Sequence, residues 1–166
     1  MTRPRRLFLL AAIAAALLTT QAAQARELVG FRGYPAGSIV IFTGARQLLY
    51  VLDGGRAIRY PVGVGRAGMA WHGRARVALK RMRPAWQAPP SITGGSYGPV
   101  IAGGSPRNPM GAAVLGLDHG NYAIHGTNNP ASVGGFVSHG CIRMYNADVL
   151  DLYARAPVGT AVIVLR

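Results

Sequence analysis

From residue 38 onward the sequence is a succession of short apolar runs separated by glycine-containing turns, a pattern that few folds accommodate. The runs 38–43 and 47–52 are rich in the β-branched and aliphatic residues that favour strands. The turn Asp53-Gly54-Gly55-Arg56 follows them and is typical of a β-hairpin. Further candidate strands are 57–60, 61–65, 75–81, 113–117, 122–125 and 160–165, with a turn at 118–121. Repeated short strands of this kind predict a mainly β domain, a sandwich or a barrel.

One helix is expected, over 146–155, with Asn146 as its N-cap and Pro157 as the residue that stops it. Asp148 and Asp151 lie near its N-terminal end, where the helix dipole favours carboxylates. An acid pair of the glycosidase kind would instead flank a cleft.

The segment 82–109 is rich in proline and glycine, contains Trp86 and has no sustained periodicity. Long irregular segments in compact domains are usually functional or mobile loops. We interpret this one as a lid or cleft wall within a single domain, because no internal repeat or second domain is evident.

The first 25 residues have the layout of a secretory signal peptide. Arginines among the first six residues precede the apolar run 7–18, and Ala23 and Ala25 supply the small residues of a cleavage site. A membrane anchor is the alternative, but the run is shorter than the ~20 residues that span a bilayer. We expect cleavage after Ala25, export to the periplasm or cell wall with no remaining membrane anchor, a lead-in at 26–37 and one domain at 38–166.

The chain is strongly basic, with 18 Lys+Arg against 5 Asp+Glu and a formal net charge of +13. Lys80 is the single lysine, so the positive charge is carried by guanidinium groups, which bind carboxylates and phosphates through a planar fork. Wall polymers and lipid head groups are the anions available to an exported protein, and an ordinary solvated surface is the alternative. No aromatic-interleaved basic stripe indicates a nucleic-acid partner.

The only cysteine and two of the four histidines lie close together in the sequence, at Cys141, His125 and His139. A thiol becomes a nucleophile as its thiolate, which a neighbouring imidazole promotes. If 138–144 is extended, His139 and Cys141 share one face, so local spacing favours His139 as the partner. Gly140 allows close backbone approach, and the amides of Gly140 and Cys141 are candidate oxyanion donors.

Two other interpretations of these residues remain open. A lone cysteine is often a small buried hydrophobe, although a free thiol is less neutral in an oxidising compartment. A zinc site from His125, His139 and Cys141 has no matching local spacing and no fourth ligand, so no metal is expected.

The motif His125-Gly126-Thr127 and the motif Ser-His-Gly-Cys-Ile-Arg-Met at 138–144 resemble the signature of the L,D-transpeptidase (YkuD-type) catalytic domain. Segments 63–65, 71–73 and 108–111, with Lys80 and Trp86, are similar to upstream landmarks of that family. The resemblance implies a mainly β fold of two packed mixed sheets, with one short helix after the cysteine and a long irregular cleft loop.

The resemblance also implies an activity, peptidoglycan cross-linking without a cofactor. Cys141 would attack the carbonyl of the third residue of a tetrapeptide stem, and D-alanine would leave as a thioester forms. An amine of a second stem, or a lipoprotein lysine in some relatives, would resolve the thioester. Papain-like proteases differ, because they place the histidine after the nucleophile.

By the same resemblance, each motif residue acquires an expected role. His125 becomes the proton acceptor and donor, oriented by the carbonyl of Gly126, which overrides the local argument for His139. His139 would orient the substrate with support from Ser138, and Arg143 would hold a stem carboxylate. Trp86 and Tyr122 complete the expected substrate-binding set.

Two alternatives to transpeptidation stay open at this point. Water could resolve the thioester, which would make the protein an L,D-carboxypeptidase or amide hydrolase. A non-catalytic wall-binding protein with a structural cysteine is the other.

Overall fold

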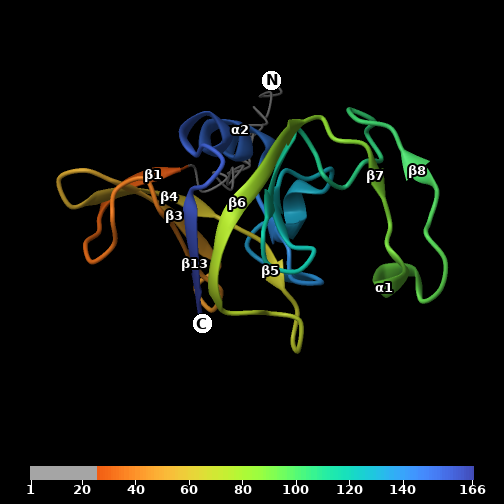
Figure 1. Ribbon diagram of the computed structural model, residues 1–166, viewed down its shortest axis with the longest axis horizontal. Helices are drawn as coiled ribbons and strands as arrows, with labels where there is room; N and C mark the ends of the chain where they lie inside the picture. Colours follow the sequence, from red (N-terminus) through yellow and green to blue (C-terminus); the bar gives the residue numbers. More distant parts are fainter. Residues whose placement is uncertain (1–25) are drawn as a thin grey trace, which may run out of the picture.

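A computed structural model describes residues 26–166, so the expected signal peptide lies outside the described residues. Most strands form one nine-stranded sheet in the order β1-β4-β3-β2-β13-β6-β9-β10-β12 (Figure 1). The strands are β1 (Glu27–Gly30), β2 (Ile39–Phe42), β3 (Gln47–Leu52), β4 (Arg56–Pro61), β5 (Val64–Gly65), β6 (Gly73–Met82), β7 (Trp86–Gln87), β8 (Val100–Ile101), β9 (Ala113–Leu117), β10 (Ala123–His125), β11 (Phe136–Ser138), β12 (Ile142–Arg143) and β13 (Ala161–Leu165). The helices are α1 (Pro90–Thr93), the short 3-10 helix η1 (Pro130–Ser132) and α2 (Asn146–Arg155).

The long strand β6 joins the two halves of this sheet. Its first residues pair with β13, and the stretch from Val77 to Met82 pairs with β9 across a register shift. The β1-to-β13 half and the β9-to-β12 half therefore curl around a shared interior. The mainly β prediction is confirmed, and the two packed sheets expected from the resemblance are two parts of one continuous curled sheet.

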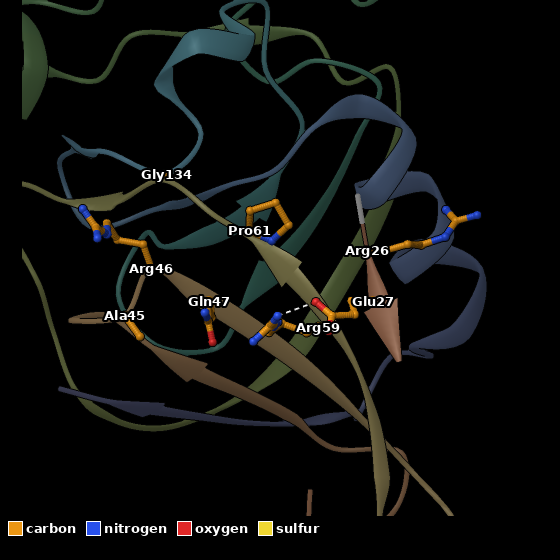
Figure 2. A pocket seen from close by; sticks show the side chains of 8 residues that line it. All are labelled: Arg26, Glu27, Ala45, Arg46, Gln47, Arg59, Pro61 and Gly134. Carbon is orange, nitrogen blue, oxygen red and sulfur yellow. Dashed lines mark hydrogen bonds and ion pairs between the residues drawn. The ribbon is translucent and has the colours of Figure 1, made fainter. Parts of the chain in front are cut away.

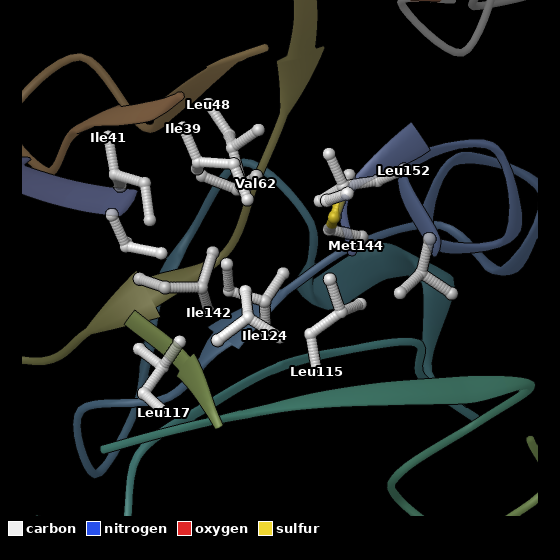
Figure 3. Packing of buried hydrophobic residues seen from close by; sticks show 14 of the residues in the cluster. Ile39, Ile41, Leu48, Val62, Leu115, Leu117, Ile124, Ile142, Met144 and Leu152 are labelled. Atoms are coloured by element: carbon white, nitrogen blue, oxygen red, sulfur yellow. The ribbon is translucent and has the colours of Figure 1, made fainter. Parts of the chain in front are cut away.

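The interior between the two halves is filled by aliphatic side chains (Figure 3). Ile39 and Ile41 of β2 face Ile124 and Ile142, and Met144 packs with the residues of α2 at one side. Each of these five side chains is at most 1% exposed, and burying a side chain of this size is worth roughly 1.5–3 kcal/mol. The short strands β10 and β12 are thus anchored in the core.

The outer face of the β1-to-β13 half has its own smaller apolar cluster. It contains Val40, Leu49, Val51, Ala57 and Ile163, which alternate along their strands with residues of the main core. Phe31, Tyr34 and Phe42 pack against it from the edge.

Several local predictions match the structure closely. The hairpin at 53–56 joins β3 to β4, with Leu52 opposite Arg56, and the helix spans the expected residues. The N-cap prediction is wrong: Tyr145 occupies that position, and Asn146 is the first helical residue. Its side chain bonds Ala112 and Thr127 instead of the free amides of its own helix.

Two segments contain more regular structure than the sequence indicated. The lead-in at 26–37 includes β1, which pairs with β4 at the edge of the sheet. The irregular segment after β6 contains the β7–β8 ribbon and α1, which project from the body of the domain (Figure 1). Within the described part of the chain, no helix has the length and apolar character needed to cross a membrane.

Candidate active site

Parallel pairing of β10 with β12 brings the two sequence motifs together. Ile124 pairs with Ile142 and His125 with Arg143, while the amide of Met144 donates to the His125 carbonyl over 2.8 Å. Cys141 immediately precedes β12 and lies beside the start of β10, where the Ala123 amide favours its thiolate. Continuing the pairing by one residue places Cys141 opposite Ala123. The thiol and the His125 imidazole are therefore offset by two residues along the neighbouring strands.

His125 is a buried, neutral imidazole. It is 4% exposed, and its Nδ1 lies 2.6 Å from the carbonyl oxygen of Gly126. A carbonyl only accepts, so Nδ1 carries the proton and Nε2 keeps its lone pair. Burial lowers the pKa of His125 to about 4 and the Arg143 charge adds to the lowering, while the backbone carbonyls of Gly126 and Pro109 oppose it. The ring is therefore uncharged at neutral pH.

The Cys141 thiol is half-buried, and its Sγ lies 4.0 Å from the carbonyl oxygen of Asn121. Burial raises the pKa of Cys141, and the Ala123 amide and the Arg143 charge lower it to a smaller extent. The resting pair is thus a thiol and a neutral imidazole, so the thiol must lose its proton during the reaction.

A tight turn at His139 and Gly140 sets the position of Cys141, the next residue. Gly140 has φ +122°, and a Cβ there would overlap the Tyr122 ring, so only glycine fits both the backbone and the space. The Ser138 hydroxyl donates to the Cys141 carbonyl over 2.6 Å and accepts from the Gly140 amide over 3.0 Å. These two bonds close the turn on itself.

This turn overturns two details of the sequence interpretation. Because residues 139 and 140 bend, the segment 138–144 is not extended throughout, and the local argument for pairing His139 with Cys141 fails. Ser138 bonds the turn backbone and not His139, and it already occupies the Gly140 amide that was expected in the oxyanion hole.

Trp71 supports the turn, although sequence reasoning assigned it no role at the site. Its Nε1 donates to the Gly140 carbonyl over 3.1 Å, and its ring stacks on Tyr122 at 5.2 Å between centroids. His119 packs on the same indole at 4.7 Å. The contact spans 69 residues of sequence, and the only signal for it was the family-like stretch 71–73.

Arg143 occupies a fixed position beside His125. Its backbone exchanges two hydrogen bonds of 2.8 Å with Gly63. Its Nε is buried without a hydrogen-bond partner among the described residues. A buried guanidinium nitrogen of this kind is costly unless a ligand completes it.

Asn146 is a second residue that the sequence analysis did not place at the site. Its Oδ1 accepts from the amides of Ala112 (3.0 Å) and Thr127 (3.1 Å), and its Nδ2 donates to the Thr127 carbonyl (3.0 Å). A Cβ at Gly126 would overlap that Oδ1. Asn146 thus fixes the segment that carries the carbonyl bonded to His125.

The remaining expected residues lie in different places. Tyr122 lies against the turn, as described, whereas Trp86 lies in β7 and pairs with Ile101 of the projecting ribbon. In residues 26–166, no three His, Cys, Asp or Glu side chains are grouped so that they could hold a metal ion.

A cysteine and a neutral histidine on adjacent strands, with a turn that fixes the thiol, define a candidate acyl-transfer site. The family model of the YkuD type, described as the L,D-transpeptidase catalytic domain, matches residues 36–164. The chain therefore belongs to the L,D-transpeptidase catalytic domain family.

Curated relatives agree with this assignment. The probable L,D-transpeptidase YbiS of Escherichia coli is 34% identical over 134 residues, covering 75% of this chain and 43% of that protein. A stretch of 69 residues is 52% identical to the YqjB protein of Bacillus subtilis, covering 39% of each chain. The matches thus span less than half the length of these curated relatives.

Solved structures share the fold. L,D-transpeptidase 3 from Mycobacterium tuberculosis, in complex with a faropenem-derived adduct, superposes with a TM-score of 0.62 at 16% identity, covering 78% of this chain and 60% of that one. The catalytic domain of the Enterococcus faecium L,D-transpeptidase gives 0.62 at 18% identity, covering 80% of this chain and 100% of that one.

Proposed function

We propose that this protein is a peptidoglycan L,D-transpeptidase that uses Cys141 as nucleophile and His125 as general base. The observation that carries the proposal is the Nδ1 contact of His125 with the Gly126 carbonyl, 2.6 Å long, which leaves Nε2 as the proton acceptor. Family membership supplies the substrate class, the tetrapeptide stems of the cell wall.

In the acylation half, Cys141 Sγ attacks the carbonyl carbon of the third stem residue. The thiol proton passes to His125 Nε2 as the sulfur–carbon bond forms. The same proton is then donated to the departing D-alanine nitrogen as the carbon–nitrogen bond breaks, and a thioester remains. The Cys141 amide is the remaining candidate donor for the developing oxyanion, since Ser138 occupies the Gly140 amide.

In the transfer half, an amine of a second stem attacks the thioester carbon. His125 takes a proton from that amine and returns it to the sulfur, which restores the resting thiol. A lipoprotein lysine is a second acceptor of the same chemistry. Water as acceptor would give the carboxypeptidase reaction instead.

Arg143 binds a stem carboxylate in this proposal. The support for that role is the position of Arg143 next to His125 in the strand pairing, together with a guanidinium whose Nε has no partner among the described residues. His139, within the cysteine turn, orients the substrate, Tyr122 lies against that turn as a contact residue, and Trp86 contacts the stem from the β7–β8 ribbon. The signal-like leader supports export to the periplasm or cell wall, with cleavage after Ala25.

Product analysis tests the proposal. Protein spanning residues 26–166 is incubated with soluble disaccharide-tetrapeptide, and the products are separated by liquid chromatography and mass spectrometry. Dimeric stems with released D-alanine are expected, and the Cys141→Ala variant should give neither. Tripeptide monomers alone would assign the carboxypeptidase reaction. Absence of both products from a folded protein with a titratable thiol would favour the non-catalytic wall-binding alternative.

A further inference from the structure

A basic cavity that Cys141 does not line lies beside the strands β1, β3 and β4. Its volume is about 450 Å³, and its lining includes Arg26, Arg46 and Arg59 with a single carboxylate, Glu27 (Figure 2). Gly134, in the segment that leads to β11, closes one side. The cavity is not used in the mechanism above.

The three guanidinium groups are spread out along the cavity. Figure 2 shows Arg46 and Arg26 at opposite ends, with the ion pair between Arg59 and Glu27 between them. A small ligand would need donors that converge on one point. Donors arranged in a row suit an extended ligand that carries several anionic groups.

Arg46 is held in place without a carboxylate. Its backbone has φ +54°, a conformation that is uncommon for residues other than glycine. Its guanidinium carbon lies 5.1 Å from the centroid of the Phe136 ring, which fixes the side chain by a cation–π contact. No ion pair involves Arg46 in the part of the chain described, so its guanidinium group is available to bind an anionic ligand.

The other two arginines are only partly neutralised. Arg59 pairs with Glu27, whose side chain is 56% exposed, and Arg26 lies 3.9 Å from Asp151. Asp151 is already held by Arg155 through two bonds of 3.0 Å. The cavity therefore keeps an excess of positive charge.

The cavity and the cysteine lie at two ends of one short segment. Seven residues separate Gly134 from Cys141, so their Cα atoms are at most about 25 Å apart even if the chain were fully extended. Strand β11 pairs with β5 between them, which makes the connection rigid. The two places are therefore close enough together to lie within the length of one extended polymer strand.

We propose that this cavity is a second binding site for the peptidoglycan strand, which holds carboxylates of stem peptides next to the stem that reacts at Cys141. The inference rests on the proposed function, because it takes the same polymer as the ligand. Stem peptides repeat along the strand and carry carboxylates, which matches a row of guanidinium forks. Such a site raises affinity for the polymer without touching the reacting bond.

Co-sedimentation with purified, insoluble peptidoglycan tests the proposal without requiring catalysis. All proteins carry Cys141→Ala, so that binding alone is measured. Arg46→Gln should weaken binding about threefold, and Arg26→Gln by a similar factor. Glu27→Gln should tighten binding, because it frees Arg59, and a variant that merely unfolds would not do so. The matched control is Arg56→Gln, on the same strand as Arg59 but three residues away and facing the opposite side, which should bind like the parent.

Two further measurements identify the anion. Binding should fall in 0.5 M salt and on peptidoglycan whose carboxyl groups have been amidated. Equal binding to native and amidated peptidoglycan, or equal effects of Arg46→Gln and Arg56→Gln, would overturn the proposal. Binding that requires attached phosphate polymers and is lost after their extraction would also overturn it.

The same set separates this inference from the proposed function. If the protein binds peptidoglycan through the arginines yet forms no product from soluble stems, the cavity proposal stands and the transpeptidase proposal fails. If the protein cross-links soluble stems but binds the polymer equally with and without Arg46, the transpeptidase proposal stands and the cavity proposal fails.

Discussion

The cysteine turn and the arginine cavity lie at opposite ends of the segment 134–141, and they are built in opposite ways. At the turn, Gly140 has φ +122° and no room for a Cβ, while Ser138 and Trp71 hold its amide and its carbonyl. At the cavity, Gly134 has φ +86° with nothing within 4 Å of an added Cβ. Chemistry at a carbonyl needs atoms fixed in place, whereas attraction of a polyanion needs charge and open space.

The largest expected difference between the two regions is in turnover. His125→Gln removes the base and should slow D-alanine release from soluble disaccharide-tetrapeptide by about 10²–10⁴-fold. Arg46→Gln should leave that rate within about twofold, because a soluble monomer does not need the cavity. Retention of more than about a tenth of the activity by His125→Gln would mean that another group, His139 first, accepts the proton.

The two glycines provide a matched pair for stability. Gly140→Ala should lower the free energy of unfolding by about 3 kcal/mol, since it combines backbone strain with overlap onto Tyr122. Gly134→Ala should cost about 1 kcal/mol, because only the positive φ opposes it. Urea unfolding of both variants checks the contrast, and equal losses would mean that the turn is looser than described.

Acid should destabilise the cysteine side and leave the cavity charge intact. Burial depresses the pKa of His125 to about 4 in the folded protein, so the unfolded chain takes up the proton first as the pH falls. The stabilising contribution of the neutral His125 ring is complete above pH ~6.5 and is lost progressively as the pH falls toward 4. The loss in the free energy of unfolding amounts to about 2 kcal/mol at pH 4.5.

Urea unfolding at pH 7.0 and pH 4.5 measures this loss, with His125→Gln as the control that lacks the titrating group. The wild-type protein should lose more stability than the variant between the two pH values. Identical losses would show that His125 is not buried as a neutral ring. The arginines stay charged throughout this range, so polymer binding through them should persist at pH 4.5.

The smallest contrast concerns the aromatic residue next to each region. Trp71→Phe keeps a ring on Tyr122 but removes the Nε1 donor to Gly140, so kcat should fall several-fold with little change in KM. The free energy of unfolding should fall by about 1 kcal/mol, because one hydrogen bond is lost. Phe136→Leu removes the ring under Arg46 and should leave kcat on soluble stems unchanged. A larger fall in kcat for Phe136→Leu than for Trp71→Phe would reverse the assignment.

The sequence predicted the parts of this molecule that depend on local patterns. Short runs of β-branched and aliphatic residues between glycine turns located β2, β3 and β9, and Pro157 followed the observed end of α2. The strand β1 was missed, because its pairing with β4 supplies the stability that its four residues lack by themselves. The two-residue strands β8 and β12 gave no periodic signal for the same reason, whereas β5 lies within the expected strand 61–65.

At the site, the sequence identified the cysteine and both histidines, but the spacing argument favoured His139 and was wrong. The bend at Gly140 separates His139 from Cys141, and parallel pairing of β10 with β12 brings His125 in. Both facts are tertiary, and the resemblance to the family supplied what local spacing could not. Trp71 and Gly140 are 69 residues apart in the sequence, so no local pattern predicts the hydrogen bond between them.

The most direct test of the central claim is the intact mass of the protein during turnover. After brief exposure to disaccharide-tetrapeptide and acid quench, we expect a mass gain equal to the stem minus D-alanine, located on the peptide that contains Cys141 and absent from Cys141→Ala. The same exposure of His125→Gln should give this adduct far more slowly. Release of D-alanine by Cys141→Ala at the wild-type rate, or an adduct on any other residue, would contradict the account.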